Sequence, residues 1–185
     1  MNDKLKIFSK GILDVSPLMI PVVPFGIIFG VIGMDLGIGP YMTFGLSVII
    51  FGGASQIVLL QLFSGGASSL VILTSVGAVN SRHFLYGAVL SENLSNLRII
   101  WKIILSYILT DQAFAVSNNY FKKNKNNKVH HYHLLGSGLT CWTVWQFSTI
   151  VGIVLGSVVP EELGLQFAIP ITFLALLIND FTKIK

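Results

Sequence analysis

Two polar residues, Arg82 and His83, lie within an apolar stretch that is long enough to cross a bilayer. A charged arginine in the middle of a membrane costs roughly 2.5–3.5 kcal/mol even on the insertion scale, so such residues usually have a function. Arg82 stays protonated and can hold a carboxylate through two hydrogen bonds. His83 can exchange a proton near neutral pH. The pair predicts binding of an anionic group together with proton transfer.

Four polar side chains share one broad arc if this stretch is helical: Asn80, Arg82, His83 and Tyr86. Asp111, in a later apolar stretch, is the carboxylate best suited to proton coupling or to pairing with Arg82. We therefore predict that Asn80, Arg82 and Tyr86 bind a solute and that His83 or Asp111 carries a proton. A purely structural pair of Arg82 with Asp111 or Asp180 remains the alternative.

The stretch from Phe51 to Gln56 brings two glycines and two uncharged polar groups into another apolar segment. Gly52 and Gly53 loosen a helix, and a loosened helix exposes backbone groups and helix ends to a solute. Ser55 and Gln56 add a hydroxyl and an amide, which suit a polar or zwitterionic solute. The alternative is that Gln56 bonds to a neighbouring helix.

The first apolar segment contains three prolines in eight residues: Pro17, Pro21 and Pro24. Each removes a backbone donor, and the freed carbonyls cannot face lipid. We predict a broken backbone near Pro21–Gly26, with Pro24 and Gly26 at the solute site. A kinked helix packed on its neighbours is the alternative. Gly26 and Gly30 also have the spacing that lets helices approach closely.

The composition of the whole chain indicates a bilayer as its solvent. The chain has 185 residues, of which 53% are hydrophobic and 11% charged, with a mean hydropathy of +0.76. Soluble domains carry about 25% charged residues. The net charge of +4 does not indicate nucleic-acid binding, because no basic stretch alternates with stacking aromatics. The single cysteine, Cys141, excludes an internal disulfide and a cysteine-based metal site.

Hydropathy predicts an all-α, polytopic membrane bundle with broken helices and about six spans, near residues 15–34, 41–62, 67–90, 99–118, 134–159 and 165–181. Alternation places nine of the twelve basic residues on the side of the N-terminus, so that side is predicted to be cytoplasmic. Arg98 and Lys102 oppose this pattern. A re-entrant segment in place of one span would break the alternation. Four aromatic residues near span ends are interpreted as interfacial anchors: Trp101, Trp142, Trp145 and Tyr132.

Residues 1–185 are predicted to form one membrane domain, with possible repeat halves at 12–120 and 134–185. Their similarity rests on Gly26–Gly30 and Gly152–Gly156. Six spans would make the halves parallel, whereas an inverted pair would require a re-entrant segment. The basic stretch 121–133 between them is predicted to be a cytoplasmic loop. Its histidines leave a metal or lipid-headgroup site as the alternative.

Four stretches resemble the AzlC family of branched-chain amino acid exporters: Pro24–Gly26, Phe51–Gln56, Asn80–Tyr86 and Leu109–Ala115. The resemblance implies a large subunit that exports valine, leucine and isoleucine from a bacterial cell across its inner membrane. It also implies a small AzlD-type membrane partner. We predict no cofactor and no metal. Phosphate-loop, serine-elbow and zinc-helix motifs are absent from the sequence, so we do not predict an enzyme.

Two other classes of protein remain open at this point. A non-transporting membrane scaffold or assembly subunit would explain the many small-residue contacts but not the polar residues in three spans. A transporter for another small polar solute would need the same polar residues. A passive channel would need a continuous polar stripe, and the sequence does not show one.

Overall fold

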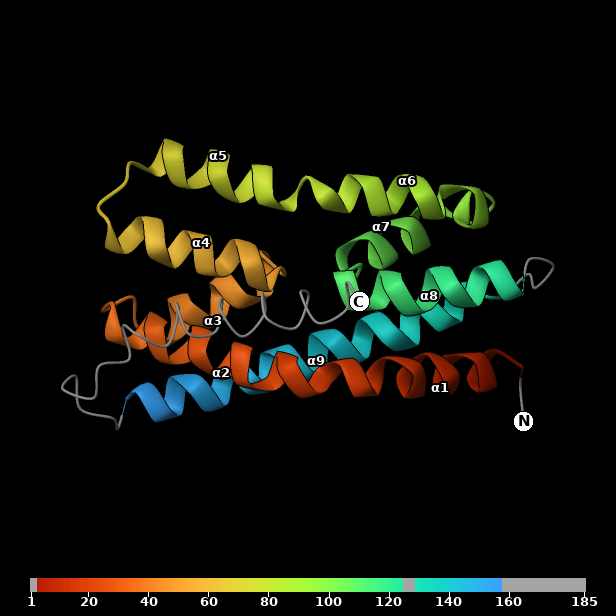
Figure 1. Ribbon diagram of the computed structural model, residues 1–185, viewed down its shortest axis with the longest axis horizontal. Helices are drawn as coiled ribbons and strands as arrows, with labels where there is room; N and C mark the ends of the chain where they lie inside the picture. Colours follow the sequence, from red (N-terminus) through yellow and green to blue (C-terminus); the bar gives the residue numbers. More distant parts are fainter. Residues whose placement is uncertain (1–2, 125–128, 158–185) are drawn as a thin grey trace, which may run out of the picture.

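The computed structural model describes residues 3–124 and 129–157. Its helices, in order, are α1 (Asp3–Val15), the 3-10 turn η1 (Ser16–Leu18), α2 (Met19–Asp35), α3 (Pro40–Ile49), α4 (Gly53–Ser64), α5 (Ser69–Asn80), α6 (Arg82–Leu94), α7 (Ile99–Tyr107), α8 (Asp111–Lys123) and α9 (His131–Gly156). These ranges contain no strand, which confirms the all-α prediction (Figure 1). The predicted span 165–181 and Asp180 lie outside the described residues.

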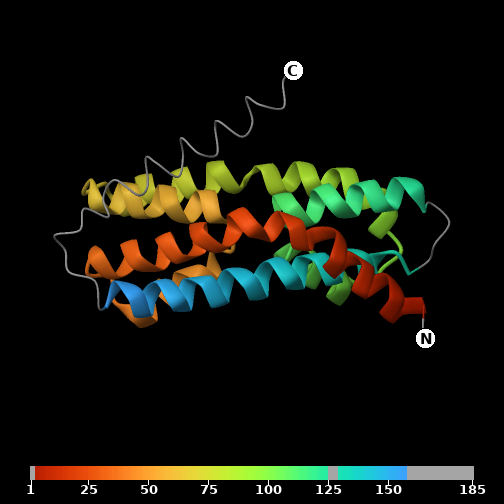
Figure 2. The ribbon, with the colours of Figure 1, turned by 60° about the horizontal axis from the view of Figure 1, so that its bottom comes forward.

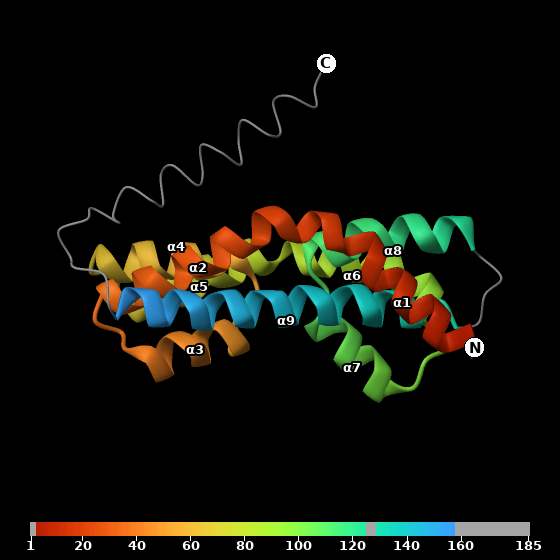
Figure 3. The same ribbon diagram turned by 90° about the horizontal axis from the view of Figure 1, so that it is seen from below.

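Two long helical rods, α1–α2 and α9, run parallel through the molecule (Figures 2 and 3). Within the described chain, Asp3–Asp35 and His131–Gly156 are the helical stretches long and apolar enough to cross a membrane. The rods touch through glycines, because a Cβ at Gly30 would collide with the Thr149 carbonyl and one at Gly152 with the Ile27 carbonyl. The predicted close approach of these helices is confirmed.

The second predicted span, residues 41–62, does not cross the molecule. Thr43 of α3 lies against Gly33, near the end of α2, whereas Gly53 at the start of α4 lies against Phe25, nearer the middle. The chain breaks at residues 50–52, and α4 returns to the end at which α3 began (Figure 1). The prediction of a single crossing here is wrong, because hydropathy measures length and not direction.

The fourth predicted span, residues 99–118, turns back in the same way from the opposite end. The Trp101 ring of α7 meets the His131 ring edge-on at the start of α9, at 5.1 Å between centroids. Tyr107, further along α7, accepts a hydrogen bond from Trp142 further along α9. After a break at residues 108–110, α8 returns to the end where α9 begins (Figure 1). This segment is therefore also re-entrant, and the six-span alternation is wrong.

The two re-entrant segments move the connections to new sides. The described lysines and arginines other than Arg82 now lie toward the end where α1 begins: Lys4, Lys6, Lys10, Arg98, Lys102, Lys122 and Lys123. We call this the basic end. Arg98 and Lys102, which opposed the six-span pattern, agree with the observed one.

The order of elements repeats with opposite direction. A broken rod followed by a re-entrant pair occurs first as α1–α2 with α3–α4 and again as α5–α6 with α7–α8. The Gly26–Gly30 and Gly152–Gly156 stretches instead lie side by side in the parallel helices α2 and α9. The predicted halves 12–120 and 134–185 stay a prediction, because residues 158–185 lie outside the described ranges.

The break in the first rod lies earlier than the prolines predicted. It falls at η1, and α2 continues through Pro21 and Pro24, so a broken backbone near Pro21–Gly26 is wrong. Pro21 is in the first turn of α2, where backbone N–H groups have no intrahelical acceptor to lose. The predicted loop 121–133 is also shorter than expected, because α8 extends to Lys123 and α9 begins at His131.

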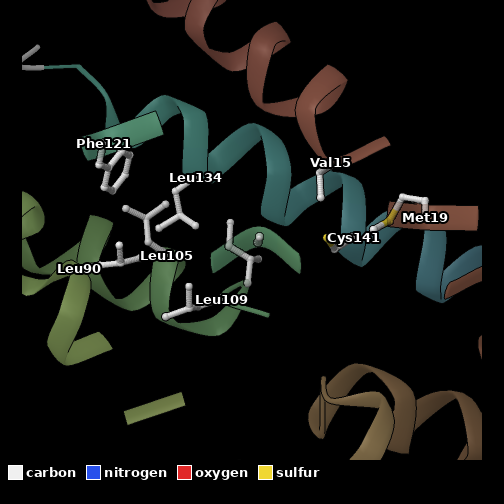
Figure 4. Packing of buried hydrophobic residues seen from close by; sticks show 10 residues of the cluster. Val15, Met19, Leu90, Leu105, Leu109, Phe121, Leu134 and Cys141 are labelled. Carbon is white, nitrogen blue, oxygen red and sulfur yellow. The ribbon is translucent and has the colours of Figure 1, made fainter. Parts of the chain in front are cut away.

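A buried hydrophobic cluster holds the basic end together. Figure 4 shows side chains from α6, α7 and α8 gathered beside Leu134 of α9, whereas Val15 of α1 and Met19 of α2 lie near Cys141 further along α9; the other labelled members are Leu90, Leu105, Leu109 and Phe121. A second cluster joins α2, α4 and α9 around Phe29 and Trp145. The two clusters fix the re-entrant pairs against the rods.

Candidate functional site

Three helix breaks meet near the middle of the molecule. The Tyr107 hydroxyl, at the end of α7, donates to the Val48 carbonyl in α3 at 2.6 Å. A Cβ at Gly52 would lie 2.8 Å from Oδ1 of Asn80, the last residue of α5. Most of the polar residues singled out in the sequence thus lie at helix ends, where backbone groups are free. We call this region the central site.

An ion pair joins the first residues of α6 and α8. Arg82 Nη2 lies 3.1 Å from Asp111 Oδ2. The Tyr86 hydroxyl donates to Asp111 Oδ1 at 2.5 Å. Asp111 starts α8, and the positive end of that helix favours a carboxylate there. The side chains of Arg82 and Asp111 are 32% and 40% exposed, so the pair can be reached from outside the bundle.

His83 follows Arg82 in α6 and lies next to this pair. Its ring is half-buried and meets the ring of Tyr86 edge-on, at 5.8 Å between centroids. Tyr86 is held on its other side by Phe114 of α8, which stacks on it at 4.4 Å. The sequence-predicted residues Arg82, His83, Tyr86 and Asp111 are therefore brought together by α6 and α8.

The break between α3 and α4 is uncharged and is closed by side-chain amides. Gln56 Nε2 donates to the carbonyls of Ser47 and Ile50, both at 3.2 Å. Gln146 Nε2 from α9 donates to the same Ser47 carbonyl at 3.3 Å. Ser55 Oγ donates to the Gly52 carbonyl at 2.8 Å. These bonds satisfy carbonyls at the end of α3, so the amide nitrogen of Gln56 has the structural role left open above.

Several buried polar atoms near the central site have no hydrogen-bond partner among the described residues: Gln56 Oε1, Asn80 Oδ1, Arg82 Nε and Gln146 Oε1. Buried polar atoms are nearly always bonded, so unpaired ones mark places where a ligand or water can bind. Three of the four are oxygen acceptors. The central site can therefore accept hydrogen bonds from a donor-rich group such as an ammonium.

Two predicted site residues, Gly26 and Gly53, have packing contacts instead, and a third, Pro24, is exposed on α2. A Cβ at Gly26 would lie 2.8 Å from Ser148 Cβ, and one at Gly53 would lie 2.9 Å from the Trp145 ring. Both glycines allow α2 and α4 to approach α9.

Sequence reasoning missed residues that close the central site. Trp142 Nε1 donates to the Tyr107 hydroxyl at 2.9 Å in the middle of α9. Trp145 is 5% exposed and packs on Phe25 and Phe29. The interpretation of both tryptophans as interfacial anchors is wrong. Gln146, a lone amide in an apolar span, was the available signal.

A cavity of about 320 Å³ lies between α6 and α7, extending from Gly87, next to Tyr86, toward Lys102 at the basic end. Its lining is mostly leucine with a few serines: Gly87, Leu90, Ser91, Leu94, Ser95, Lys102, Leu105, Ser106, Leu109 and Leu134. A volume of this size is at the lower end of small-molecule sites. The cavity could hold a small apolar side chain.

Comparison with known proteins places this chain in a family of membrane proteins. The family model described as AzlC protein matches residues 17–159. The inner membrane protein YgaZ of Escherichia coli is 29% identical over 182 residues, covering 95% of this chain and 74% of the relative. An uncharacterized membrane protein of Archaeoglobus fulgidus is 29% identical, covering 96% and 77%. One of Helicobacter pylori J99 is 25% identical, covering 99% and 79%. No solved structure matches.

Proposed function

This chain belongs to the AzlC protein family, and from that premise we propose that it is a subunit of a proton-coupled secondary transporter that exports valine, leucine and isoleucine. The observation that carries the proposal is the Arg82–Asp111 pair at the meeting point of broken, oppositely directed helices. Secondary transporters place their substrate sites where discontinuous helices of inverted repeats meet. We propose no enzymatic activity.

The ion pair has the charges needed to exchange for a zwitterion. The substrate carboxylate binds the Arg82 guanidinium in place of Asp111, and the substrate ammonium binds Asp111. One positive and one negative charge enter together, so no buried charge is left uncompensated. The unpaired oxygens of Gln56 and Asn80 are further acceptors for the ammonium.

The branched side chain of the substrate would enter the leucine-lined cavity between α6 and α7. Gly87 at its inner end follows Tyr86, which contacts Asp111. Burying a side chain of this class contributes roughly 1.5–3 kcal/mol. This supports an apolar amino acid over a polar one.

The basic end supports an orientation and a route. Because loops rich in lysine and arginine stay in the cytoplasm, we place the basic end and the N-terminus there, in the inner membrane of a bacterial cell. The cavity reaches Lys102 at this end. Substrate would then enter from the cytoplasm, as export requires, and His83 or Asp111 would carry the coupled proton.

The exposure of the ion pair supports a partner subunit. A charged pair that is 32% and 40% exposed would face lipid if nothing covered it, and charges are costly there. The neighbouring Phe84 and Leu85 of α6 are 82% and 68% exposed. We propose that a small AzlD-type membrane subunit packs on this face of α6.

The test is release of valine from cells loaded with a valine-containing dipeptide, with and without the small partner. We expect release that an uncoupler abolishes, and its loss in Arg82→Ala at equal membrane abundance. Arg98→Ala is the matched control and should export normally. Unchanged efflux in Arg82→Ala would refute the assigned role. Release insensitive to the uncoupler would indicate a channel, and no release a scaffold.

A further inference from the structure

A buried chain of hydrogen bonds joins α1, α8 and α9 in the basic half of the molecule, apart from the central site. The imidazole of His133 is fully buried. Its Nε2 lies 3.0 Å from Asp14 Oδ2, and its Nδ1 lies 3.1 Å from Ser117 Oγ. Ser117 Oγ continues to Ser137 Oγ at 3.1 Å. The Tyr120 ring stacks on the imidazole at 4.2 Å.

Asp14 connects this chain to an opening. Its side chain is 33% exposed and lines a cavity of about 320 Å³ together with Lys10, Tyr120 and Lys123. Lys10 Nζ lies 2.9 Å from Asp14 Oδ1. The charged and titratable groups around His133 are therefore Asp14, Lys10 and Tyr120, with Lys123 at the opening. Asp14 can meet water, whereas His133 cannot.

The two other histidines of this region are bound elsewhere. His130 Nε2 lies 2.9 Å from the Asn93 carbonyl. His131 packs against Trp101. His133 alone among these three lies between a carboxylate and a hydroxyl. His133 is therefore the histidine of this group that can exchange a proton within a hydrogen-bonded chain.

The chain can be satisfied with a neutral imidazole. Nε2–H donates to the Asp14 carboxylate, and Nδ1 accepts from the Ser117 hydroxyl. Ser117 Oγ in turn accepts from the Ser137 hydroxyl. Each atom in the chain then has a partner, and the imidazole carries one proton.

The chain can also be satisfied with one more proton. Ser137 Oγ lies 3.2 Å from the Leu134 carbonyl and can donate to it. Ser117 then donates to Ser137, and Nδ1–H donates to Ser117 while Nε2–H still donates to Asp14. The imidazole then holds one proton more than in the first arrangement and is an imidazolium, whose charge the Asp14 carboxylate balances. Only the two serine hydroxyls turn, and no buried group loses its partner.

From these two arrangements we infer that Asp14, His133 and Ser117 form a second proton-binding site, additional to His83 or Asp111 of the central site, that takes up and releases one proton in the transport cycle. Ser117 lies on α8, the helix that starts at Asp111 of the central site. Reversal of the Ser117 bond therefore acts on the element that holds the substrate-binding carboxylate. The role in transport rests on the proposed function, whereas proton binding itself does not.

Proton binding is tested by nitrogen NMR of the histidines in the purified full chain in lipid nanodiscs. We expect one imidazole that changes from the Nε2–H tautomer to imidazolium in the acidic pH range. This signal should be absent in His133→Gln and present in the matched control His131→Gln. Asp14→Asn removes the balancing charge, so the imidazolium signal should be lost from this range. If His133 keeps a single protonation state across the whole pH titration, the inference is overturned. The spectra of the wild-type chain are sufficient for this test.

Coupling is tested by valine efflux from the same variants with the partner present. We expect efflux in His133→Gln to lose its dependence on the proton gradient, whereas His131→Gln keeps it. Gradient-dependent efflux retained in full by His133→Gln would overturn the coupling role and leave the proposed function standing. Absence of wild-type efflux, with a titrating His133, would refute the proposed function and support the proton site.

Discussion

The two re-entrant pairs share a backbone plan and differ in chemistry. α3 and α4 have 10 and 12 residues, and α7 and α8 have 9 and 13. In both pairs the second helix begins in the middle of the molecule. The N-cap residue of α4 is Gly52, which has no side chain to cap the helix. The N-cap residue of α8 is Thr110, whose hydroxyl accepts a hydrogen bond from the Ala113 amide at 3.4 Å. α8 also begins with a charge, Asp111, and α4 begins with Gly53.

This difference in chemistry suggests a structural role for the α3–α4 break and a solute-binding role for the α7–α8 break. The side-chain amides of Gln56 and Gln146 donate hydrogen bonds to carbonyls of the α3–α4 break from inside the bundle. The α7–α8 break is held to α6 by a partly exposed ion pair. Bonds between exposed charges exchange readily with other ions. We expect mutations in the first break to affect stability more and mutations in the second to affect transport more.

Asp111→Ala should have the largest effect, because it removes the acceptor of both Arg82 and Tyr86. Hydrogen bonds to charged groups contribute about 1.5–3 kcal/mol, which corresponds to roughly tenfold to hundredfold in rate or affinity. We expect valine efflux to fall by about tenfold or more at equal membrane abundance. Asp35→Ala, an aspartate at the end of α2, is the control. Normal efflux in Asp111→Ala would remove the distinction between the two breaks.

Gln56→Leu should destabilise the protein, because it leaves the Ile50 carbonyl without its amide donor and the Ser47 carbonyl with the donor from Gln146 alone. A buried group that loses its partner costs about 1–3 kcal/mol. We expect a lower unfolding temperature in detergent, measured by tryptophan fluorescence. Gln61→Leu, at an exposed position of the same helix, should leave that temperature unchanged. Equal stability of Gln56→Leu and the parent would show that these bonds do not hold the break.

Gly52→Ala should reduce transport by a smaller factor. Its Cβ would lie 2.8 Å from Asn80 Oδ1 and from Ser55 Oγ, and both side chains would have to move. We expect the unfolding temperature to fall, and valine efflux to fall by a smaller factor than in Asp111→Ala. Gly77→Ala is the control, since a Cβ there meets nothing within 4 Å. An equal effect of both substitutions would argue against a role of Asn80 at the break.

Thr110→Gly should have the smallest effect, because it gives the α7–α8 break the kind of cap that the α3–α4 break already has. Replacing a threonine cap by glycine costs only a few tenths of a kcal/mol. The unfolding temperature should fall slightly, and Thr110→Ala should lower it further. A fall in valine efflux in Thr110→Gly as large as that in Asp111→Ala would mean that the cap, and not the charge, distinguishes the two breaks.

Sequence patterns located the breaks better than the spans. Gly52 and Gly53 predicted an interruption where α3 ends, and the polar stretch from Asn80 contains the junction of α5 and α6. These signals are local, because they concern the conformations and donors of adjacent residues. Pro24 was misleading for the same reason. α2 passes through it and breaks earlier, at η1.

The sequence suggested several candidate partners for a polar side chain but could not choose among them. Arg82 pairs with Asp111, one of the two carboxylates considered for it. His133 looked like part of a polar loop, yet it is buried against Asp14 because α9 begins at His131 and packs tightly on α1. At Gly11 a Cβ would collide with the His133 carbonyl. No local pattern carries such a contact.

The sequence by itself determined the solvent of this protein, its helical class and the interruption at Gly52–Gly53, since each depends on composition or on neighbouring residues. Tertiary structure decided whether the chain continues or turns back after each interruption. Those outcomes depend on contacts between distant residues. Gln146 closes the end of α3 from 99 positions away, and His133 meets Asp14 across 119. Hydropathy has no access to such pairs, because a half-helix has the same composition in either direction.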